Sequence, residues 1–290
     1  MIDSAPALPV VGLFGANLGP FADPATATRL ARRAERLGYE SLWAADHVVL
    51  PAPRTPESPL EPDQPLLEPL VALTHLAART ERIRLGTGCI VLPQRNPLVL
   101  AKQLASLDVV SDGRLLFGTA VGYLEPELRA LGVPVRERGA QMDEYLRAVR
   151  SLWEDEHPSQ HGKFVDFAGV DAHPRPRQRP VPLLVGGHSR AAHRRAARYG
   201  DEWFGFRLSP AATAEQLRSL AEAAAEVGRQ GPPLRITVAP SRPLDPDTVR
   251  AYAELGVHRL VVITPYNPET ALLEELVERN APELIGARPH

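Results

Sequence analysis

The chain has 290 residues, 44% of them apolar, which is enough for one large α/β barrel or two ordinary domains. Its 33 basic and 35 acidic residues give a formal net charge of -2, which leaves no electrostatic footprint for nucleic acid. The single cysteine, Cys89, excludes an internal disulfide and a thiolate metal cluster. No apolar stretch approaches the roughly 18 residues of a membrane span, and the N-terminus lacks the basic segment of a signal peptide, so we expect a cytoplasmic protein.

Short apolar segments alternate with longer amphipathic segments along the chain. The pattern predicts eight buried strands, at 10–17, 39–45, 83–92, 114–121, 182–187, 203–206, 234–240 and 258–265. It predicts eight helices, at 24–38, 68–80, 97–111, 139–154, 189–199, 211–229, 246–255 and 268–279. Three of these helices have an Asx–Pro start, at Asp23, Asn96 and Asn267, with the proline at the first helical position.

Eight strand–helix units in one chain of this length predict a (β/α)8 TIM barrel that spans residues 1–290 as a single domain. A doubly wound open sheet is the alternative, but the first strand ends in GANLGP, which does not fit a dinucleotide-binding fingerprint. Residues 47–67 and 122–181 are read as insertions after strands 2 and 4. The second insertion is predicted to hold a helix and a short hairpin around GKFVDFAG.

The active site of such a barrel lies at the C-terminal ends of its strands. After strand 5, two glycines and Ser189 lead directly into a helix. One interpretation is a backbone cradle for a phosphate, to which Arg190 could add charge; the other is a tight turn with a serine cap. Arg194 and Arg195 are expected to be solvated charges of the helix.

Asp46 and His47 follow strand 2 in the same way. A histidine there can move protons near neutral pH or donate a hydrogen bond to a ligand, or it can simply pack under the insertion. The histidines share no metal-like spacing, so no metal site is expected. No G-x-S-x-G motif supports a serine nucleophile, and Cys89, inside an apolar strand, is read as a structural residue.

Four segments together resemble the luciferase-like flavin and deazaflavin oxidoreductases, and most closely the actinobacterial-type branch assigned to coenzyme F420. They are LGYESLWAADHVVLP (37–51), EPLVALTHLAARTERIRLGTGCIVLPQRNPLVLAKQLASLDVVSDGRLLFGTAVGY (68–123), LGVPVRERGAQMDEYLRAVRSLW (131–153) and VGGHSRAAHRRAARYGDEWF (185–204). They cover roughly the first two-thirds of the chain in the family's order and spacing.

The resemblance implies a barrel with the cofactor ring at its C-terminal mouth. It implies that Gly186, Gly187, His188 and Ser189 hold the cofactor phosphate, largely through their backbone. Arg207 is a weaker candidate implied by it, as a partner for the anionic tail of the cofactor.

The resemblance also implies which residues lie next to the cofactor ring. Gly88 and Cys89 would form a non-prolyl cis peptide that backs the ring, and His47 would face the hydride-bearing carbon. Asp46 would orient His47 or touch the cofactor. Tyr123 stands about where sugar-phosphate dehydrogenases of the family carry a proton-donating glutamate. Its absence argues against that reaction, although Glu125 and Glu127 lie close by.

Two further departures from the family pattern concern glycines. Glu202 stands where the family usually has glycine, so it is expected to alter the local turn. Ala120 also stands where glycine is common, and it is expected to press on the ring or the substrate.

The resemblance implies a coenzyme F420-dependent oxidoreductase that transfers a hydride between the cofactor C5 and a small organic substrate, with His47 and Tyr123 as candidate catalytic residues. An FMN-dependent two-component monooxygenase is the alternative, and a non-catalytic flavin-binding barrel is a third possibility. The only lysines, Lys102 and Lys163, lie on a predicted helix and in an insertion, which weakens a Schiff-base aldolase. Expected partners are the substrate, an F420 or flavin reductase, and a second copy bound through helix 97–111.

Overall fold

Eight strand positions close into a parallel barrel in the computed structural model, which describes residues 6–290. Neighbouring strands pair in parallel around the ring, which includes the pairs of β1 with β11 and of β3 with β5. The predicted TIM barrel is therefore confirmed. The barrel strands are β1 (Val10–Phe14), β2 (Ser41–Ala44), β3 (Arg84–Thr87) continued by β4 (Ile90–Val91), β5 (Leu115–Ala120), β8 (Leu183–Gly186), β9 (Glu202–Leu208), β10 (Arg235–Pro240) and β11 (Arg259–Ile263).

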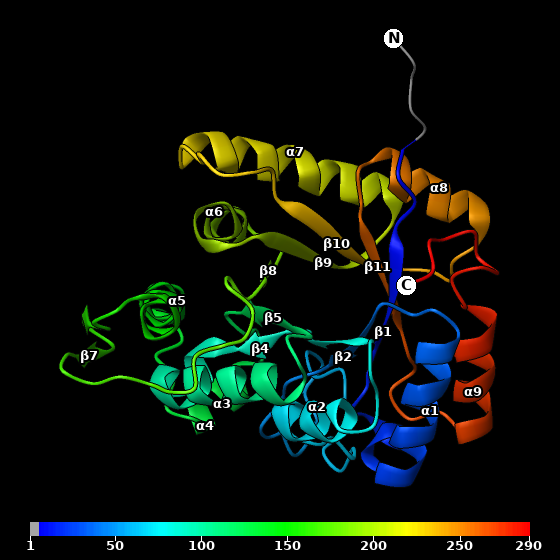
Figure 1. The fold of residues 1–290 in the computed structure, drawn as a ribbon, viewed down its shortest axis with the longest axis horizontal. Helices are drawn as coiled ribbons and strands as arrows, with labels where there is room; N and C mark the ends of the chain where they lie inside the picture. The colour runs from blue at the N-terminus through cyan, green and yellow to red at the C-terminus, as the bar shows by residue number, and fades with distance from the viewer. Residues whose placement is uncertain (1–5) are drawn as a thin grey trace.

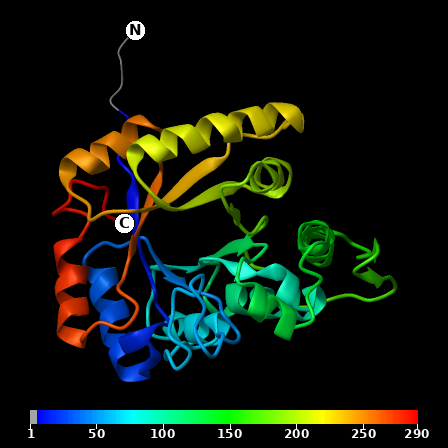
Figure 2. The same cartoon turned by 180° about the vertical axis from the view of Figure 1, so that it is seen from behind.

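Helices surround the barrel, as Figures 1 and 2 show from opposite sides. In both views α7 and α8 lie along one side of the strands, and α1 and α9 lie beside each other on another. The eight predicted helices are present as α1 (Pro24–Arg36), α2 (Pro69–Ala77), α3 (Pro97–Val110), α5 (Arg138–Glu154), α6 (Arg190–Tyr199), α7 (Pro210–Glu226), α8 (Pro246–Glu254) and α9 (Thr270–Arg279). Three short helices were not predicted: η1 (Gly19–Ala22), η2 (Leu92–Gln94) and α4 (Glu125–Ala130).

Two of the three predicted Asx–Pro helix starts are confirmed. The Asp23 side chain accepts a hydrogen bond from the Thr26 N–H, and the Asn96 side chain accepts from the backbone at the start of α3. The prediction at Asn267 is wrong, because α9 begins only at Thr270 and has no side-chain cap. The chain before α9 is instead held by Gln64, whose amide donates to the carbonyl oxygen of Tyr266.

The barrel strands are buried on both faces, which explains why they read as continuous apolar runs. Leu13 and Leu42 belong to the cluster packed under the helices. Their neighbours Phe14 and Trp43 belong to a second cluster inside the barrel. This alternation of successive side chains divides each strand between the two cores.

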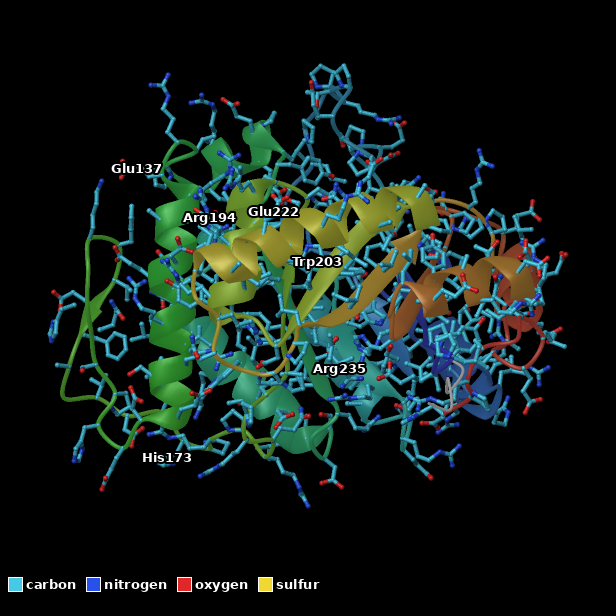
Figure 3. The ribbon with its side chains drawn as sticks, turned by 90° about the horizontal axis from the view of Figure 1, so that it is seen from above. Glu137, His173, Arg194, Trp203, Glu222 and Arg235 are labelled. Carbon is cyan, nitrogen blue, oxygen red and sulfur yellow. The ribbon has the colours of Figure 1, made fainter. Side chains whose placement is uncertain are left out.

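Both predicted insertions are present. Residues 47–67 form an irregular segment of turns and bends, and its Pro59 and Leu60 line the cavity at the barrel mouth. The segment 122–181 contains α4 as well as the predicted helix, and its hairpin is confirmed as β6 (Gln160–His161) paired antiparallel with β7 (Asp166–Phe167). In Figure 3, Glu137 lies at the start of α5 and His173 lies beyond its far end.

Candidate functional site

A cavity of about 450 Å³ opens at the C-terminal ends of the barrel strands. Its walls are mostly apolar, and the rings of Phe14 and Phe206 lie 5.3 Å apart in them. This volume lies within the range typical of small-molecule sites. Nine of the ten predicted site residues line the cavity: Asp46, His47, Gly88, Cys89, Tyr123, Gly186, Gly187, Ser189 and Arg207.

The glycine pair forms the bare-backbone part of the cavity wall. Gly187 has φ +124°, and a Cβ at this position would lie 2.9 Å from the Cβ of Ala192, so a larger residue would be strained. Ser189 caps α6 by accepting a hydrogen bond from the Ala192 N–H at 3.2 Å. The first N–H groups of the helix lack intrahelical partners, so a capped turn and an anion cradle are compatible here.

His188 is the predicted site residue that does not line the cavity. Its Nε2 accepts a hydrogen bond from the Phe206 N–H at 3.1 Å, which ties the glycine loop to β9. Burial lowers the pKa of His188, which favours the neutral ring that this acceptor role requires. Trp203 lies behind the same loop, fully buried, and donates from Nε1 to the carbonyl oxygen of Gly187 at 2.9 Å.

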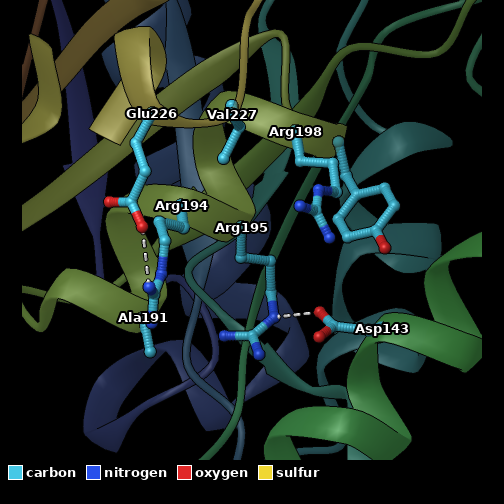
Figure 4. A pocket seen from close by; sticks show the side chains of 8 residues that line it. Asp143, Ala191, Arg194, Arg195, Arg198, Glu226 and Val227 are labelled. Carbon is cyan, nitrogen blue, oxygen red and sulfur yellow. Dashed lines mark hydrogen bonds and ion pairs between the residues drawn. The ribbon is translucent and has the colours of Figure 1, made fainter. Parts of the chain in front are cut away.

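The arginines at the start of α6 are not part of the cavity lining; Figure 4 shows Arg194 beside Glu226 and Arg195 beside Asp143. Arg190 and Arg194 pair with Glu226 of α7 at 3.1 and 3.0 Å. Arg195 lies 2.6 Å from Asp143 of α5 and is buried, so the expectation that it is a solvated charge is wrong. The cause is tertiary: α6 packs between α5 and α7, and its arginine-bearing face lies against both helices.

The predicted non-prolyl cis peptide between Gly88 and Cys89 is confirmed. It lies between β3 and β4, which together make up the third barrel strand. Cys89 is half-buried and lines the cavity, so the interpretation as a purely structural cysteine is incomplete. Burial raises the pKa of its thiol to about 12, so Cys89 presents a neutral thiol at physiological pH.

His47 is held by a glutamate from the second insertion. The Nδ1 atom of His47 lies 2.8 Å from Oε2 of Glu127, and the Val48 N–H donates to Oε1 of the same carboxylate at 2.6 Å. The ring of Tyr123 stands edge-on to the His47 ring at 6.0 Å. The sequence showed Glu127 only as a glutamate close to Tyr123; its bond to His47 was not predicted, because no local pattern connects it to a histidine 80 positions away.

Asp46 does not hold His47, so that part of the prediction is wrong. Its carboxylate accepts from the Val91 N–H at 2.8 Å and pairs with Arg95 at 2.6 Å. Burial raises the pKa of Asp46 despite the opposing effect of Arg95. Asp46 still lines the cavity, so its contact with a cofactor stays a prediction.

Tyr123, Tyr266 and Arg207 form the polar rim of the cavity. Tyr123 is 58% exposed, yet partial enclosure, together with Tyr266 and Glu127, raises the pKa of its hydroxyl to about 12. It is therefore protonated and able to donate at neutral pH. Arg207 has φ +56°, donates to the hydroxyl of Tyr266 at 3.1 Å, and has no carboxylate partner within residues 6–290.

The two expected departures from the family pattern have different outcomes. Ala120 lines the cavity, so its contact with a ring or a substrate stays a prediction. Glu202 lies at the opposite end of the barrel, buried at the start of β9 and paired with Arg259 at 2.6 Å. The side chain of Glu202 therefore enters a charge network inside the barrel, and its effect on the local turn stays a prediction.

Within the described part of the chain, no group of three or more histidine, cysteine, aspartate or glutamate residues could hold a metal ion. Over the same residues, no helix has both the length and the apolar character needed to span a membrane.

The amino-acid sequence is similar to a family model and to several known proteins. The family model described as luciferase-like monooxygenase matches residues 10–283. An uncharacterized protein of Mycobacterium tuberculosis is 34% identical over 253 residues, which cover 83% of this chain and 87% of that protein. The FMNH(2)-dependent dimethylsulfone monooxygenase of Pseudomonas putida is 33% identical over 181 residues, 61% of this chain and 47% of its own length. The F420-dependent glucose-6-phosphate dehydrogenase of Kineococcus radiotolerans is 31% identical over 182 residues, 61% of this chain and 51% of its own.

A solved structure shows the same fold over nearly the whole chain. The coenzyme F420 dependent tetrahydromethanopterin reductase of Methanopyrus kandleri superposes with a TM-score of 0.75, at 19% identity, over 97% of this chain and 99% of that one. At this identity the likeness shows the architecture alone.

Proposed function

The chain belongs to the luciferase-like monooxygenase family of F420- or FMN-dependent oxidoreductases, and we propose that it is a coenzyme F420-dependent oxidoreductase. It would transfer a hydride between the cofactor C5 and a small organic substrate. The observation that carries the proposal is that one apolar cavity combines a glycine–serine loop at a helix start with a histidine that follows β2 and a tyrosine that follows β5. The unpaired Arg207 at the rim favours F420, since it suits a cofactor with an extended anionic tail.

The residues present fit such a cofactor. A Cβ on Gly186 would lie 2.9 Å from the Cys89 sulfur, so glycine leaves backbone exposed where a phosphate would approach. Gly186, Gly187 and Ser189 would hold the phosphate, while the Gly88–Cys89 peptide would lie behind the ring. When bound, F420 supplies a deazaflavin ring that exchanges a hydride at C5.

The chain's own side chains would position the substrate and exclude water. The aromatic walls around Phe14, Phe204 and Phe206 favour flat apolar groups and displace water from the reacting atoms. His47 and Tyr123 would hold or move a proton at the imidazole Nε2 and the phenolic oxygen. Both roles need hydrogen-bond reach to the substrate, which the position of the two residues in the cavity lining allows.

An FMN-dependent two-component monooxygenase is the second candidate. The 33% identity to an FMNH(2)-dependent monooxygenase favours it, and the glycine loop would serve its phosphate equally well. A barrel that binds a flavin-like ligand without turnover is a third candidate, which turnover of any substrate would exclude.

A binding titration of the purified protein with F420 and FMN side by side tests the proposal. Tighter binding of F420, at a Kd in the micromolar range or below, supports hydride transfer and directs the search to substrates. Preferential FMN binding would replace the proposal with the monooxygenase. Binding of neither would contradict the phosphate role of the glycine loop.

We also propose that two copies of the chain associate through α3. Val99 and Val110 are exposed on this helix, as is Val71 on the neighbouring α2. Light scattering after size-exclusion chromatography should give twice the chain mass, and Val99→Asp together with Val110→Asp should reduce it to the mass of one chain. A cytosolic F420 or flavin reductase would complete the cycle as a separate partner.

A further inference from the structure

Glu127 is a buried carboxylate whose two oxygens are both used. It is 2% exposed and belongs to α4, in the insertion after β5, whereas its partners follow β2. Oε1 accepts from the Val48 N–H at 2.6 Å, and Oε2 lies 2.8 Å from Nδ1 of His47. No other carboxylate in residues 6–290 bonds His47, since Asp46 is taken by Arg95 and the Val91 N–H.

The hydrogen-bonding capacities of these groups determine which nitrogen of His47 carries the proton. An ionised carboxylate can only accept, and a backbone N–H can only donate. The Val48 N–H therefore occupies one oxygen, and Nδ1 of His47 must donate to the other. In the neutral ring, Nε2 is then left as an acceptor, and it has no partner among the described residues.

We propose that Glu127 is a positioning residue that holds His47 with its proton on Nδ1, so that Nε2 faces the ligand as a hydrogen-bond acceptor. The neighbouring Tyr123 hydroxyl is protonated at neutral pH and faces the cavity as a donor. The wall thus offers one acceptor beside one donor. It suits a ligand that carries a hydroxyl, or an N–H beside a carbonyl. The proposal rests on the proposed function only in assigning that ligand group to the substrate.

The state of His47 can be measured without cofactor or substrate. Long-range 1H–15N correlation spectra of the full chain, labelled at histidine, distinguish the two neutral forms of each ring. They should be recorded at about pH 9, above the ordinary titration range of imidazole. The spectrum of His47→Gln identifies the His47 signals. The expected result is a protonated Nδ1 and a bare Nε2.

Glu127→Gln should reverse this state with little change of shape. The amide oxygen would keep the Val48 N–H bond, and the amide NH2 would turn to Nδ1, which must then accept; the proton moves to Nε2. Glu125→Gln is the matched control on the same helix. Glu125 is exposed and, among residues 6–290, pairs with Arg129 alone, so its variant should leave the His47 signals in place.

A protonated Nε2 in the unmodified chain, on a neutral or a charged ring, would overturn the proposal, as would a Glu127→Gln spectrum that matches the unmodified one. The measurement on the unmodified chain decides the matter even where Glu127→Gln does not fold. Once a substrate is known, Glu127→Gln should lower kcat by about 100-fold with little change in KM. Failure of F420 and FMN to bind would contradict the proposed function and leave the His47 result intact.

Discussion

At the N-terminal end of the barrel, charged side chains fill the interior and satisfy one another, whereas at the C-terminal end they surround an open cavity. Arg259 is fully buried at the N-terminal end, where it bonds Glu40 at 2.8 Å and Glu202 at 2.6 Å and also donates to Thr237. Its guanidinium also lies over the Trp43 ring, 5.6 Å from the ring centroid.

The C-terminal end also contains polar and charged side chains, but some of them have unused hydrogen-bonding capacity. The carboxylates there are occupied, Asp46 by Arg95 and Glu127 by His47. Nε2 of His47 and the Tyr123 hydroxyl have no partner in residues 6–290. The difference teaches that the polar groups of the first end serve stability and those of the second are available to a ligand. Four predictions test this division.

The largest expected effect is on stability, at the N-terminal end of the barrel. Arg259→Met should lower the free energy of unfolding by about 3–5 kcal/mol, because it leaves Glu40 and Glu202 buried without their cation. Urea denaturation measures it. Arg235→Met is the matched control, since Arg235 lies 3.7 Å from Glu202 but is 53% exposed, and it should cost less than about 1 kcal/mol. Loss of F420 or FMN binding by folded Arg259→Met protein would contradict the separation of the two ends.

The second prediction concerns the free energy of unfolding at acidic pH. Burial alone would raise the pKa of Glu40 and Glu202, but Arg259 holds both below the ordinary value of 4.5. Their stabilisation is complete above that pH and is lost as the pH falls, because the unfolded chain takes up protons first. Each carboxylate should contribute a slope of up to about 1.4 kcal/mol per pH unit. Burial raises the pKa of Asp46, so its effect has the opposite sign: stability declines as the pH rises through the interval above 3.8.

Urea titrations between about pH 3 and 6 measure these slopes. Glu202→Gln removes one titrating group at the N-terminal end of the barrel. The unfolding free energy of this variant should depend less on pH than that of the unmodified chain. An unchanged slope would mean that the acid sensitivity arises elsewhere.

The third prediction concerns the glycine loop, Gly186–Ser189, at the C-terminal end of the barrel. Gly187→Ala should cost about 1–3 kcal/mol of stability through its backbone angle. It should also weaken F420 or FMN binding at least tenfold, or about 1.4 kcal/mol. Gly228→Ala is the control, because Gly228 has φ +64° with open space around it, far from the cavity. It should lose comparable stability and keep full affinity; equal loss of affinity in both variants would remove the loop from the site.

The smallest expected effect is at the rim. Arg207→Gly replaces a non-glycine residue at φ +56°, so stability should change by less than about 1 kcal/mol. F420 affinity should fall about three- to tenfold, more than FMN affinity, and the difference should shrink at high salt. Asp112→Gly relieves a similar angle, φ 60°, away from the cavity, and should leave both affinities unchanged. Equal losses for the two cofactors would argue against a tail contact at Arg207.

Local patterns in the sequence predicted most of the fold. All eight strands and eight helices follow from apolar periodicity, and the caps at Asp23 and Asn96 follow from residues three or fewer positions apart. The Asn–Pro pattern at 267 does not lead into a helix: α9 begins at Thr270, and the preceding Tyr266 accepts a hydrogen bond from Gln64, about 200 positions away. The short α4 was missed because six residues are too few for a periodic signal.

The sequence by itself determined that nine of the ten predicted site residues reach the cavity, since a strand end followed by polar or glycine residues places them at the barrel mouth. It did not show that His188 bonds to β9 or that Glu127 joins the cavity wall. Only the tertiary structure decided what those residues bond. Closure of the barrel brings Glu127 to His47, Arg95 to Asp46, and Arg259 to Glu202 at the far end. The physical reason is range: periodicity and capping act between residues a few positions apart, whereas each of these pairs joins residues about 50 or more positions apart.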